Sequence, residues 1–362
     1  QNLKVSNLFK YQAKNSLPNY GKITAQSPSN IALVKYWGKK DIQIPTNPSI
    51  SFTLENCHTK TSLEFKKSSD FKVNLFVEGN EKPSFIPKIE QFLNRIKPYC
   101  PYIFEYELNM NTQNTFPHSS GIASSASGFS ALSMCIVQLE KSLTDFDERL
   151  KLQKASFLSR LGSGSASRSI YGPMAIWGNN NQINDSNDQY AISHNDIHPV
   201  FKDYQDTILL VDKGAKQVSS SVGHQLMHNH PYASQRFSQA NNHIEKMIKI
   251  LKKGDLEEFI SITELEALTL HAMMMTSNPY FILMKEGTLS IINKIWEFRN
   301  ASNTPLSFTL DAGANVHLLY PSSYKQNVLD FIESELVVFC ENQQYICDVV
   351  GQGAKILKEI YA

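Results

Sequence analysis

The chain has little net charge and lacks a long apolar run. Among its 362 residues, 35 Lys and Arg nearly balance 34 Asp and Glu, for a formal net charge of +1. Without an overall positive field, nucleic acid and acidic membranes are not expected partners, and any anion site must be built from local basic residues. No apolar stretch approaches the roughly 18 residues of a membrane-spanning helix, and the N-terminal residues contain no signal-peptide core. We therefore expect no membrane partner.

Cysteine is too sparse for a disulfide framework or a zinc site. The five cysteines are scattered, odd in number and without CxxC spacing, so free buried thiols in a reducing compartment are expected. That expectation places the protein in the cytoplasm. The positions are Cys57, Cys100, Cys135, Cys340 and Cys347.

The sequence also contains no internal repeat and no heptad array, and its 41% hydrophobic and 19% charged residues are typical of a soluble globular protein. Residues 1–20 are polar and are expected to form a surface extension. Residues 178–196 are rich in Asn and Asp and predict an exposed loop. Strand patterns cover residues 31–37, 49–54, 61–65, 71–77, 102–109, 173–177, 207–211, 306–311 and 316–320. Helical patterns cover residues 86–96, 122–139, 146–161, 233–252, 256–275 and 287–300. Strands and helices that occur in clumps favour a two-layer α+β architecture.

Residues 117–126 are a loop of small residues that runs directly into an amphipathic helix. Larger apolar residues recur there at helical spacing, at Ile122, Phe129, Leu132, Ile136 and Leu139. The first turn of a helix has unpaired N–H groups and the positive end of the helix dipole, so it can hold phosphate. Hydroxyl groups of the loop could add donors or a magnesium ligand. An ordinary serine-capped helix is the alternative at this point.

Three further residues are candidates for the functional site, and each also has an ordinary structural explanation. Lys35 interrupts an apolar strand pattern, where burial is costly without an anionic partner, unless the side chain reaches solvent. Arg168 lies in the Gly- and Ser-rich corner at residues 162–169, which suits a phosphorylated ligand or is a flexible turn. Asp311 stands where a strand meets a turn and is either an acid of the site or a turn former.

Together these motifs resemble the GHMP small-molecule kinases and, within them, the mevalonate diphosphate decarboxylases. The resemblance runs from about Ala25 to the last residues, and its motifs stand in order: SPSNIALVKYWGKKD with IPTNPSISFTL, FPHSSGIASSASGF, GSGSASRSIYG and LDAGAN. The motif FPHSSGIASSASGF is common to the superfamily and indicates ATP binding only. KYWGK and GSGSASRS are much more specific.

The resemblance implies a GHMP-kinase-like, two-lobed α+β fold with the active site in the cleft between the lobes. Residues 1–20 would be an extension and residues 21–200 an ATP-binding lobe like domain 2 of ribosomal protein S5. Residues 201–362 would form a ferredoxin-like lobe. The implied reaction, a step of isoprenoid biosynthesis, is ATP-dependent decarboxylation of mevalonate 5-diphosphate to isopentenyl diphosphate, with ADP, phosphate and CO2 as the other products. ATP and Mg²⁺ are the implied cofactors, and the question of a homodimer stays open.

The same resemblance assigns roles to residues. Asp311 would orient or deprotonate the 3-hydroxyl of the substrate, and Lys35 would stabilise the transferring phosphoryl group. The substrate diphosphate would be bound by Tyr36, Lys39, Ser163, Ser165, Arg168 and Ser221. ATP would be bound by Pro117, Ser119, Ser120, Gly121, Ala123, Ser124 and Ser125. Mg²⁺ would be held through the ATP phosphates, with Ser124 or Ser125 as a candidate ligand.

Some positions depart from the family pattern. Lys88 stands where the family has a diphosphate-binding arginine and is a candidate contact of the substrate diphosphate, but this role stays open because lysine cannot form the same two-pronged contact. Ala314 replaces the usual proline in the turn after Asp311. For His271, in a helical segment, we expect a structural role, because a lone helical histidine is most often a packing residue.

Two other functions stay open on the sequence. A mevalonate-type kinase that phosphorylates without decarboxylating would share the phosphate loop, and a ligand-sensing protein could keep the fold without turnover. A serine hydrolase is not expected, because the chain has no G-x-S-x-G elbow.

Overall fold

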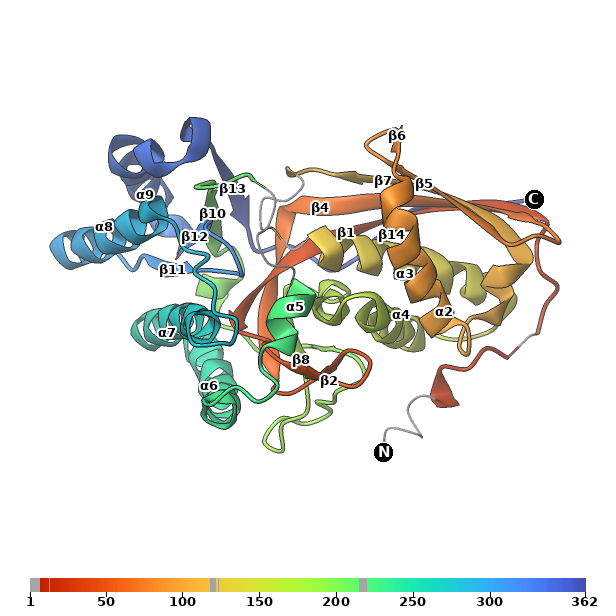
Figure 1. Cartoon of the computed structure of the whole chain (residues 1–362), viewed down its shortest axis with the longest axis horizontal. Helices are drawn as coiled ribbons and strands as arrows, with labels where there is room; N and C mark the ends of the chain where they lie inside the picture. The colour runs from red at the N-terminus through yellow and green to blue at the C-terminus, as the bar shows by residue number, and fades with distance from the viewer. Residues whose placement is uncertain (1–6, 13, 118–121, 123, 215–219) are drawn as a thin grey trace.

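Two β-sheets, each covered by helices, form the two lobes of the chain in the computed structural model (Figure 1). The structure describes residues 7–12, 14–117, 122, 124–214 and 220–362, and the side chains of residues 220 and 221 are not described either. The predicted two-lobed α+β architecture is confirmed. No helix in these ranges is long and apolar enough to cross a membrane.

The larger sheet has the strand order β14-β1-β4-β7-β5-β6, with β8 and β9 attached through β4. All its strand pairs are antiparallel except β5 with β7. Its strands are β1 (Tyr20–Val34), β4 (Ser49–Lys67), β5 (Lys72–Val77), β6 (Asn80–Glu81), β7 (Tyr106–Asn114), β8 (Met174–Trp177), β9 (Ile192–Ser193) and β14 (Lys355–Tyr361).

Three helices cover one face of this sheet: α2 (Ile86–Ile96), α3 (Ser124–Leu143) and α4 (Glu148–Gly162). Asp147 caps α4 by accepting a hydrogen bond from the Leu150 N–H at 2.7 Å. The N-terminal extension is anchored here, because Phe9 is buried and its ring lies 4.8 Å from that of Phe157.

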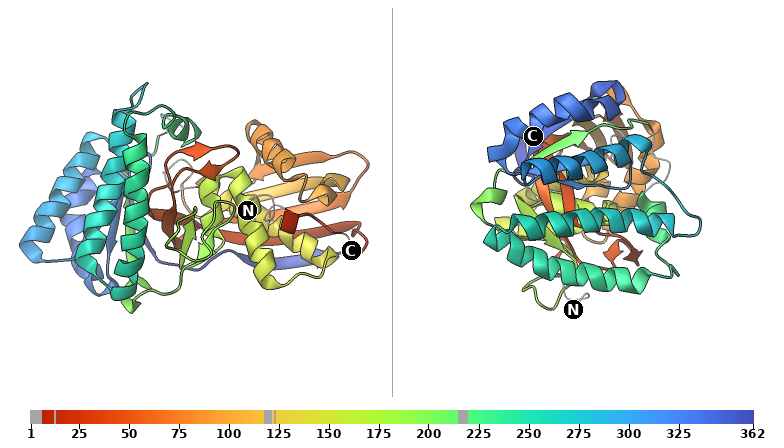
Figure 2. Two further views of the ribbon diagram at one scale, coloured as in Figure 1. Left: turned by 90° about the horizontal axis from the view of Figure 1, so that it is seen from below. Right: turned by 90° about the vertical axis from the view of Figure 1, so that its left-hand side faces the viewer.

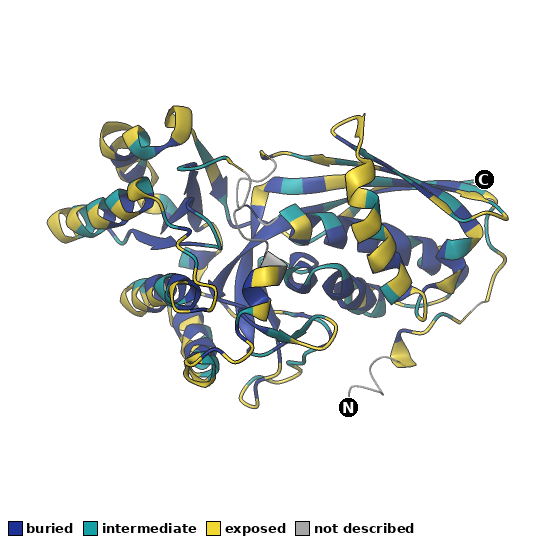
Figure 3. Cartoon of the chain, viewed as in Figure 1, coloured by how far each residue is buried: buried dark blue, intermediate teal, exposed yellow. Residues whose placement is uncertain are grey.

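The smaller sheet has the order β11-β12-β10-β13, and the long helices α6, α7 and α8 lie beside it (Figure 2). Their outer faces are exposed, whereas the central strands are buried (Figure 3). The strands are β10 (Gln205–Leu209), β11 (Ser307–Thr309), β12 (Val316–Tyr320) and β13 (Tyr345–Val349), and the helices are α5 (Ser220–Gln225), α6 (Ala233–Lys253), α7 (Leu256–Met275), α8 (Glu286–Ser302) and α9 (Lys325–Phe331). A separate pair joins β2 (Lys39–Lys40) to β3 (Ile44–Pro45).

Several predicted elements differ from the structure. The strands expected at residues 49–54 and 61–65 are one strand, β4, and β1 ends at Val34, so residues 35–37 leave the sheet. Residues 101–105 form a 3-10 helix with buried Tyr102 and Ile103, and β7 begins only at Tyr106. The loop at 178–196 is irregular except for β9, but many of its residues are partly or fully buried.

The last two strands were not predicted. β13 completes the smaller sheet, while β14 returns to the larger sheet and pairs with β1. The division of the lobes at residue 200 stays a prediction, and the final strand lies with the first lobe. The five cysteines are free as expected, but Cys347 is exposed rather than buried.

Candidate active site

Lys35 and Asp311 form an ion pair between the two lobes. The Lys35 Nζ lies 2.9 Å from Asp311 Oδ1, and only 3% of the Lys35 side chain is exposed against 28% for Asp311. Lys35 is the first residue beyond β1, and Asp311 lies two residues beyond β11. Lys35 therefore does have an anionic partner, and the alternative of a lysine that reaches solvent is wrong. The carboxylate is the more accessible member of the pair.

Arg168 supplies a buried positive charge near this pair. It lies in the 3-10 helix η3 (Gly164–Ser169), and its guanidinium donates to Ser51 Oγ at 3.0 Å and to Ser49 Oγ at 2.6 Å. Within the described ranges no carboxylate lies within ion-pair distance of it. Burial lowers the pKa of Arg168 to about 10, although Asp311 and Tyr36 oppose the shift. A buried cation whose nearest partners are neutral hydroxyls is stabilised by an incoming anion.

The tilted rings of Tyr36 and His224 pack together beside this cation. The ring of His224, from α5, lies 4.2 Å from that of Tyr36 and 4.8 Å from that of Trp37. Its Nδ1 accepts the Gly38 N–H at 3.0 Å, so the neutral ring carries its proton on Nε2. Burial, together with the charges of Lys39 and Arg168, lowers the pKa of His224 to about 3. The two cations Lys39 and Arg168 thus act on His224 in addition to its burial.

Lys39 completes this cationic region. Its Nζ donates to Gln43 Oε1 at 3.4 Å, and burial together with the charge of Arg95 lowers the pKa of Lys39. The Tyr36 hydroxyl is buried with no hydrogen-bond partner in the described part of the chain, and burial raises the pKa of Tyr36 well above its usual value. An unpaired buried hydroxyl is costly unless a ligand satisfies it. The structure thus brings together four charged or polar groups that suit an anion: Tyr36, Lys39, Arg168 and His224.

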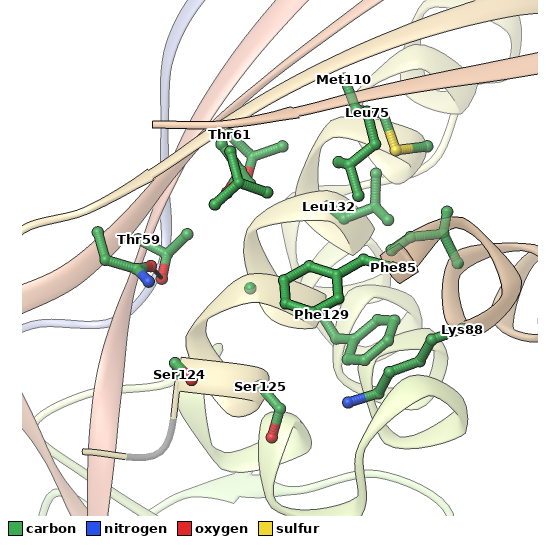
Figure 4. Close-up of a pocket in the computed structure, with 15 residues that line it drawn as sticks. Thr59, Thr61, Leu75, Phe85, Lys88, Met110, Ser124, Ser125, Phe129 and Leu132 are labelled. Carbon is green, nitrogen blue, oxygen red and sulfur yellow. Dashed lines mark hydrogen bonds between the residues drawn. The ribbon is translucent and has the colours of Figure 1, made fainter. Parts of the chain in front are cut away.

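A pocket of about 200 Å³ opens beside the start of α3 (Figure 4). Ser124, Ser125 and Lys88 lie at one end of it, and Leu75 and Met110 at the other. The Lys88 ammonium lies 5.4 Å from the centre of the Phe129 ring. The remaining lining is apolar or threonine except for Asn114: Thr59, Thr61, Val77, Phe85, Ile89, Thr112, Asn114, Gly128 and Leu132.

The pocket adjoins the Gly- and Ser-rich corner. Ser125 Oγ lies 3.5 Å from Ser163 Oγ, at the end of α4. The Ser165 carbonyl accepts from Asn30 Nδ2 at 3.0 Å, which ties η3 to β1. Lys88 lines this pocket, whereas Tyr36 and Arg168 do not. The structure therefore groups Lys88 with Ser124 and Ser125.

Some predicted site residues lie outside the described part of the chain: Ser119, Ser120, Gly121 and Ala123, together with the side chain of Ser221. Pro117 is described and exposed. Sequence reasoning missed His224, because a histidine in a short polar helix carries no signal of its own. It also missed two buried charged residues of the α6–α7 pair, Arg236 and Glu266, since both fit an ordinary amphipathic pattern.

Comparison with known proteins identifies the family. The family model for the diphosphomevalonate decarboxylase-like N-terminal domain matches residues 27–191. The model for the mevalonate 5-diphosphate decarboxylase C-terminal domain matches residues 207–359. The chain belongs to the diphosphomevalonate decarboxylase family. A diphosphomevalonate decarboxylase of Candida albicans is 29% identical over 84% of this chain and 86% of its own length.

Solved structures of the family have the same fold. The mevalonate diphosphate decarboxylase of Staphylococcus aureus matches with a TM-score of 0.82 and 27% identity, over 94% of this chain and 98% of that one. A solved complex with MVAPP, AMPPCP and magnesium shares the fold at 24% identity and a TM-score of 0.82, over 94% of this chain and 99% of that one. The GHMP-kinase-like, two-lobed fold implied by the motifs is confirmed.

Proposed function

We propose that this chain catalyses the ATP-dependent decarboxylation of mevalonate 5-diphosphate to isopentenyl diphosphate in the mevalonate pathway. The observation that carries the proposal is the Lys35–Asp311 pair at 2.9 Å, which lies beside a buried, electropositive region and between the two lobes. The family membership of the chain supports the same reaction.

In the first step the 3-hydroxyl of the substrate attacks the γ-phosphorus of ATP. Asp311 orients this hydroxyl and accepts its proton, since its carboxylate is the exposed partner of the pair. Lys35 fixes the carboxylate through Oδ1 and places a positive charge next to the transferring phosphoryl group. ADP leaves with the electrons of the broken phosphorus–oxygen bond.

In the second step the 3-phosphate leaves with the electron pair of the C3–O bond. The bond between the carboxylate carbon and C2 then breaks, and its electrons form the C2–C3 double bond while CO2 departs. No further reactant is needed, and the products are isopentenyl diphosphate, ADP, phosphate and CO2. Asp311 passes the proton it has accepted to the phosphate, which Lys35 stabilises as it departs, and the carboxylate restored at Asp311 is compatible with the positive charge that develops at C3.

The cationic region holds the 5-diphosphate, which does not react. Arg168 and Lys39 neutralise its charge, and the unpaired Tyr36 hydroxyl and the Nε2–H of His224 donate to it. Ser163 and Ser165 lie on the same corner and add hydroxyl groups. Ser221 stays a proposed contact on the strength of the family resemblance.

The pocket beside α3 holds the nucleotide. Its apolar lining suits a base, and Ser124 and Ser125 lie at the end where phosphates would meet the helix N-terminus. We place Lys88 with the ATP phosphates rather than with the substrate diphosphate, because it lines this pocket. Pro117 and the undescribed residues Ser119, Ser120, Gly121 and Ala123 belong to the same proposed loop.

The hydroxyls of Ser124 and Ser125, at the start of α3, fit a magnesium ion held mainly by ATP phosphates. Within the described ranges no group of three or more His, Cys, Asp or Glu could hold a metal ion, and Mg²⁺ commonly relies on substrate phosphates with few protein ligands. The hydroxyl of Ser124 or Ser125 would complete its shell, and bound Mg²⁺ would neutralise charge on the phosphates. A cytoplasmic location fits the five free cysteines and is part of the proposal.

The test is to incubate the protein with ATP and magnesium and with mevalonate that carries no, one or two 5-phosphates, and to measure ADP and CO2 together. Turnover is expected with the 5-diphosphate. Release of ADP without CO2 would instead establish the alternative, a mevalonate-type kinase.

A further inference from the structure

We propose that helix α7 positions Lys35 and Asp311 relative to each other. Glu266 acts through the backbone of Lys35, and His271 acts through the backbone of Asp311. The inference rests on the proposed function and adds two positioning residues to it. Neither residue needs to contact a substrate.

The backbone of Lys35 has left the sheet and needs other partners. β1 ends at Val34, yet Lys35 is 2% exposed, so its N–H and C=O cannot turn to water. Glu266 Oε2 accepts the Lys35 N–H at 2.8 Å. The Lys35 carbonyl accepts from Arg236 Nη2 at 3.0 Å and from Asn47 Nδ2 at 2.9 Å. Both polar groups of this peptide are thus held by side chains.

Glu266 can do this because it is itself held rigidly. Its side chain and that of Arg236 are both fully buried, and two hydrogen bonds of 2.8 and 2.6 Å join them. His243 Nδ1 lies 2.5 Å from Glu266 Oε1. Burial alone would raise the pKa of Glu266, but the hydrogen bond from His243 and the charge of Arg236 lower it below its usual value. The carboxylate therefore stays ionised and keeps one orientation.

His271 makes the matching contact with the other member of the pair. Its Nε2 lies 3.0 Å from the Asp311 carbonyl, and since a carbonyl can only accept, Nε2 carries the proton. Burial lowers the pKa of His271 to about 4, despite the opposing effect of Asp311, so the ring is neutral near pH 7. The expected structural role for His271 thus becomes a specific one.

One rigid helix consequently sets the distance between residues that are 276 positions apart. Glu266 and His271 are separated by about 7.5 Å along the helix axis, and each binds the peptide of one reacting residue. Both Lys35 and Asp311 stand just after a strand, where the ladder no longer fixes them. Without α7, the Lys35 N–H would lose its carboxylate partner and the Asp311 carbonyl its imidazole donor, so the 2.9 Å contact would be held less rigidly.

The first test replaces His271 by Leu, which removes the donor, and by Gln, whose amide nitrogen restores it. The Asp311 carbonyl also accepts from the Gly313 N–H at 2.8 Å, so leucine leaves no unsatisfied group and the variant should fold. Displacement of a reacting group by 1 Å costs roughly 100-fold, so we expect kcat to fall about 10- to 100-fold in His271→Leu with little change in either KM. His271→Gln should recover most of kcat.

The second test uses Glu266→Leu and its matched control Glu140→Gln. Glu140 forms another buried ion pair, with Lys154 at 2.6 Å, and its other hydrogen-bond partners are Tyr102 and Cys100 rather than residues of the Lys35–Asp311 pair. Both variants should lose thermal stability, but only Glu266→Leu should lower kcat per folded molecule. Amide hydrogen exchange at Lys35 should speed up in Glu266→Leu and stay unchanged in the control.

Amide hydrogen exchange at Lys35 tests the positioning by α7, whereas CO2 release tests the proposed function, so the two proposals can fail independently. If the wild type releases no CO2 but the Lys35 amide loses protection in Glu266→Leu, the proposed function is wrong and the positioning by α7 stands. The inference is overturned if His271→Leu keeps wild-type kcat, if His271→Gln is as slow as His271→Leu, or if the Lys35 amide keeps its protection without Glu266.

Discussion

Replacement of Asp311 by Asn removes the charge of the reacting carboxylate while it keeps the shape of the side chain. The amide cannot accept the proton of the 3-hydroxyl, and Lys35 loses the anion that lies 2.9 Å from its Nζ. Groups of this kind contribute about 10²- to 10⁴-fold, so kcat should fall by that factor. ATP affinity should be near normal, because the nucleotide pocket is lined by other residues.

The structure also gives an expected stability change for this variant. Removing one partner of a buried ion pair costs about 3–5 kcal/mol. Since 28% of the Asp311 side chain is exposed, water screens part of this charge, and we expect a smaller loss of about 1–2 kcal/mol. Loss of folding would therefore not explain a slow variant.

The assay measures ADP release at saturating ATP and mevalonate 5-diphosphate, with nucleotide binding and thermal unfolding measured on the same sample. Glu140→Gln is the matched control, because it breaks a buried lysine–carboxylate pair elsewhere and should keep kcat. If Asp311→Asn retained more than about a tenth of wild-type kcat, well above the range for an acid–base group, Asp311 would be a turn residue and the mechanism would be refuted.

Three further predictions concern binding and pH. Arg168→Ala and Lys39→Ala should each raise KM for the 5-diphosphate roughly tenfold or more, and steady-state kinetics that show both values unchanged would contradict the cationic region. Lys88→Ala should raise KM for ATP and leave that for the 5-diphosphate nearly unchanged, whereas the reverse result would return Lys88 to the substrate diphosphate. Burial lowers the pKa of His224 to about 3 and that of His271 to about 4, so the unfolded chain binds protons more readily than the folded one and stability falls as pH drops below 6.5. Each histidine should lower the free energy of unfolding by about 2 kcal/mol at pH 5. In urea unfolding, His271→Leu should therefore lose about 2 kcal/mol less stability than the wild type between pH 7 and pH 5. An equal loss in the two proteins would disprove this prediction.

The sequence predicts the individual residues of this site, but it does not predict which of them lie close together in the fold. Lys35 stands out as a charge in an apolar pattern, and Asp311 stands out at a strand end, but nothing in either segment pairs them across 276 positions. The resemblance supplied that pairing. Strand β4 was predicted as two separate strands and strand β14 was missed, because alternation of apolar residues weakens where a strand bends or lies at an edge.

The supporting residues could not be found from the sequence for a related reason. Glu266 and Arg236 occur in helices where most charged residues face water, and only the packing of α6 against α7 buries them together. His224 acquires its low pKa mainly from burial and then from the charges of Lys39 and Arg168, which the fold brings to α5. Such effects depend on tertiary contacts, which local patterns do not encode.

The most direct test of the central claim is the ratio of CO2 to ADP produced from mevalonate 5-diphosphate by the wild-type protein. A decarboxylase that transfers the γ-phosphoryl group to the 3-hydroxyl and then expels it should give one CO2 for each ADP, and should require a divalent cation. A ratio near zero, with ADP still formed, would contradict the decarboxylation and leave a kinase.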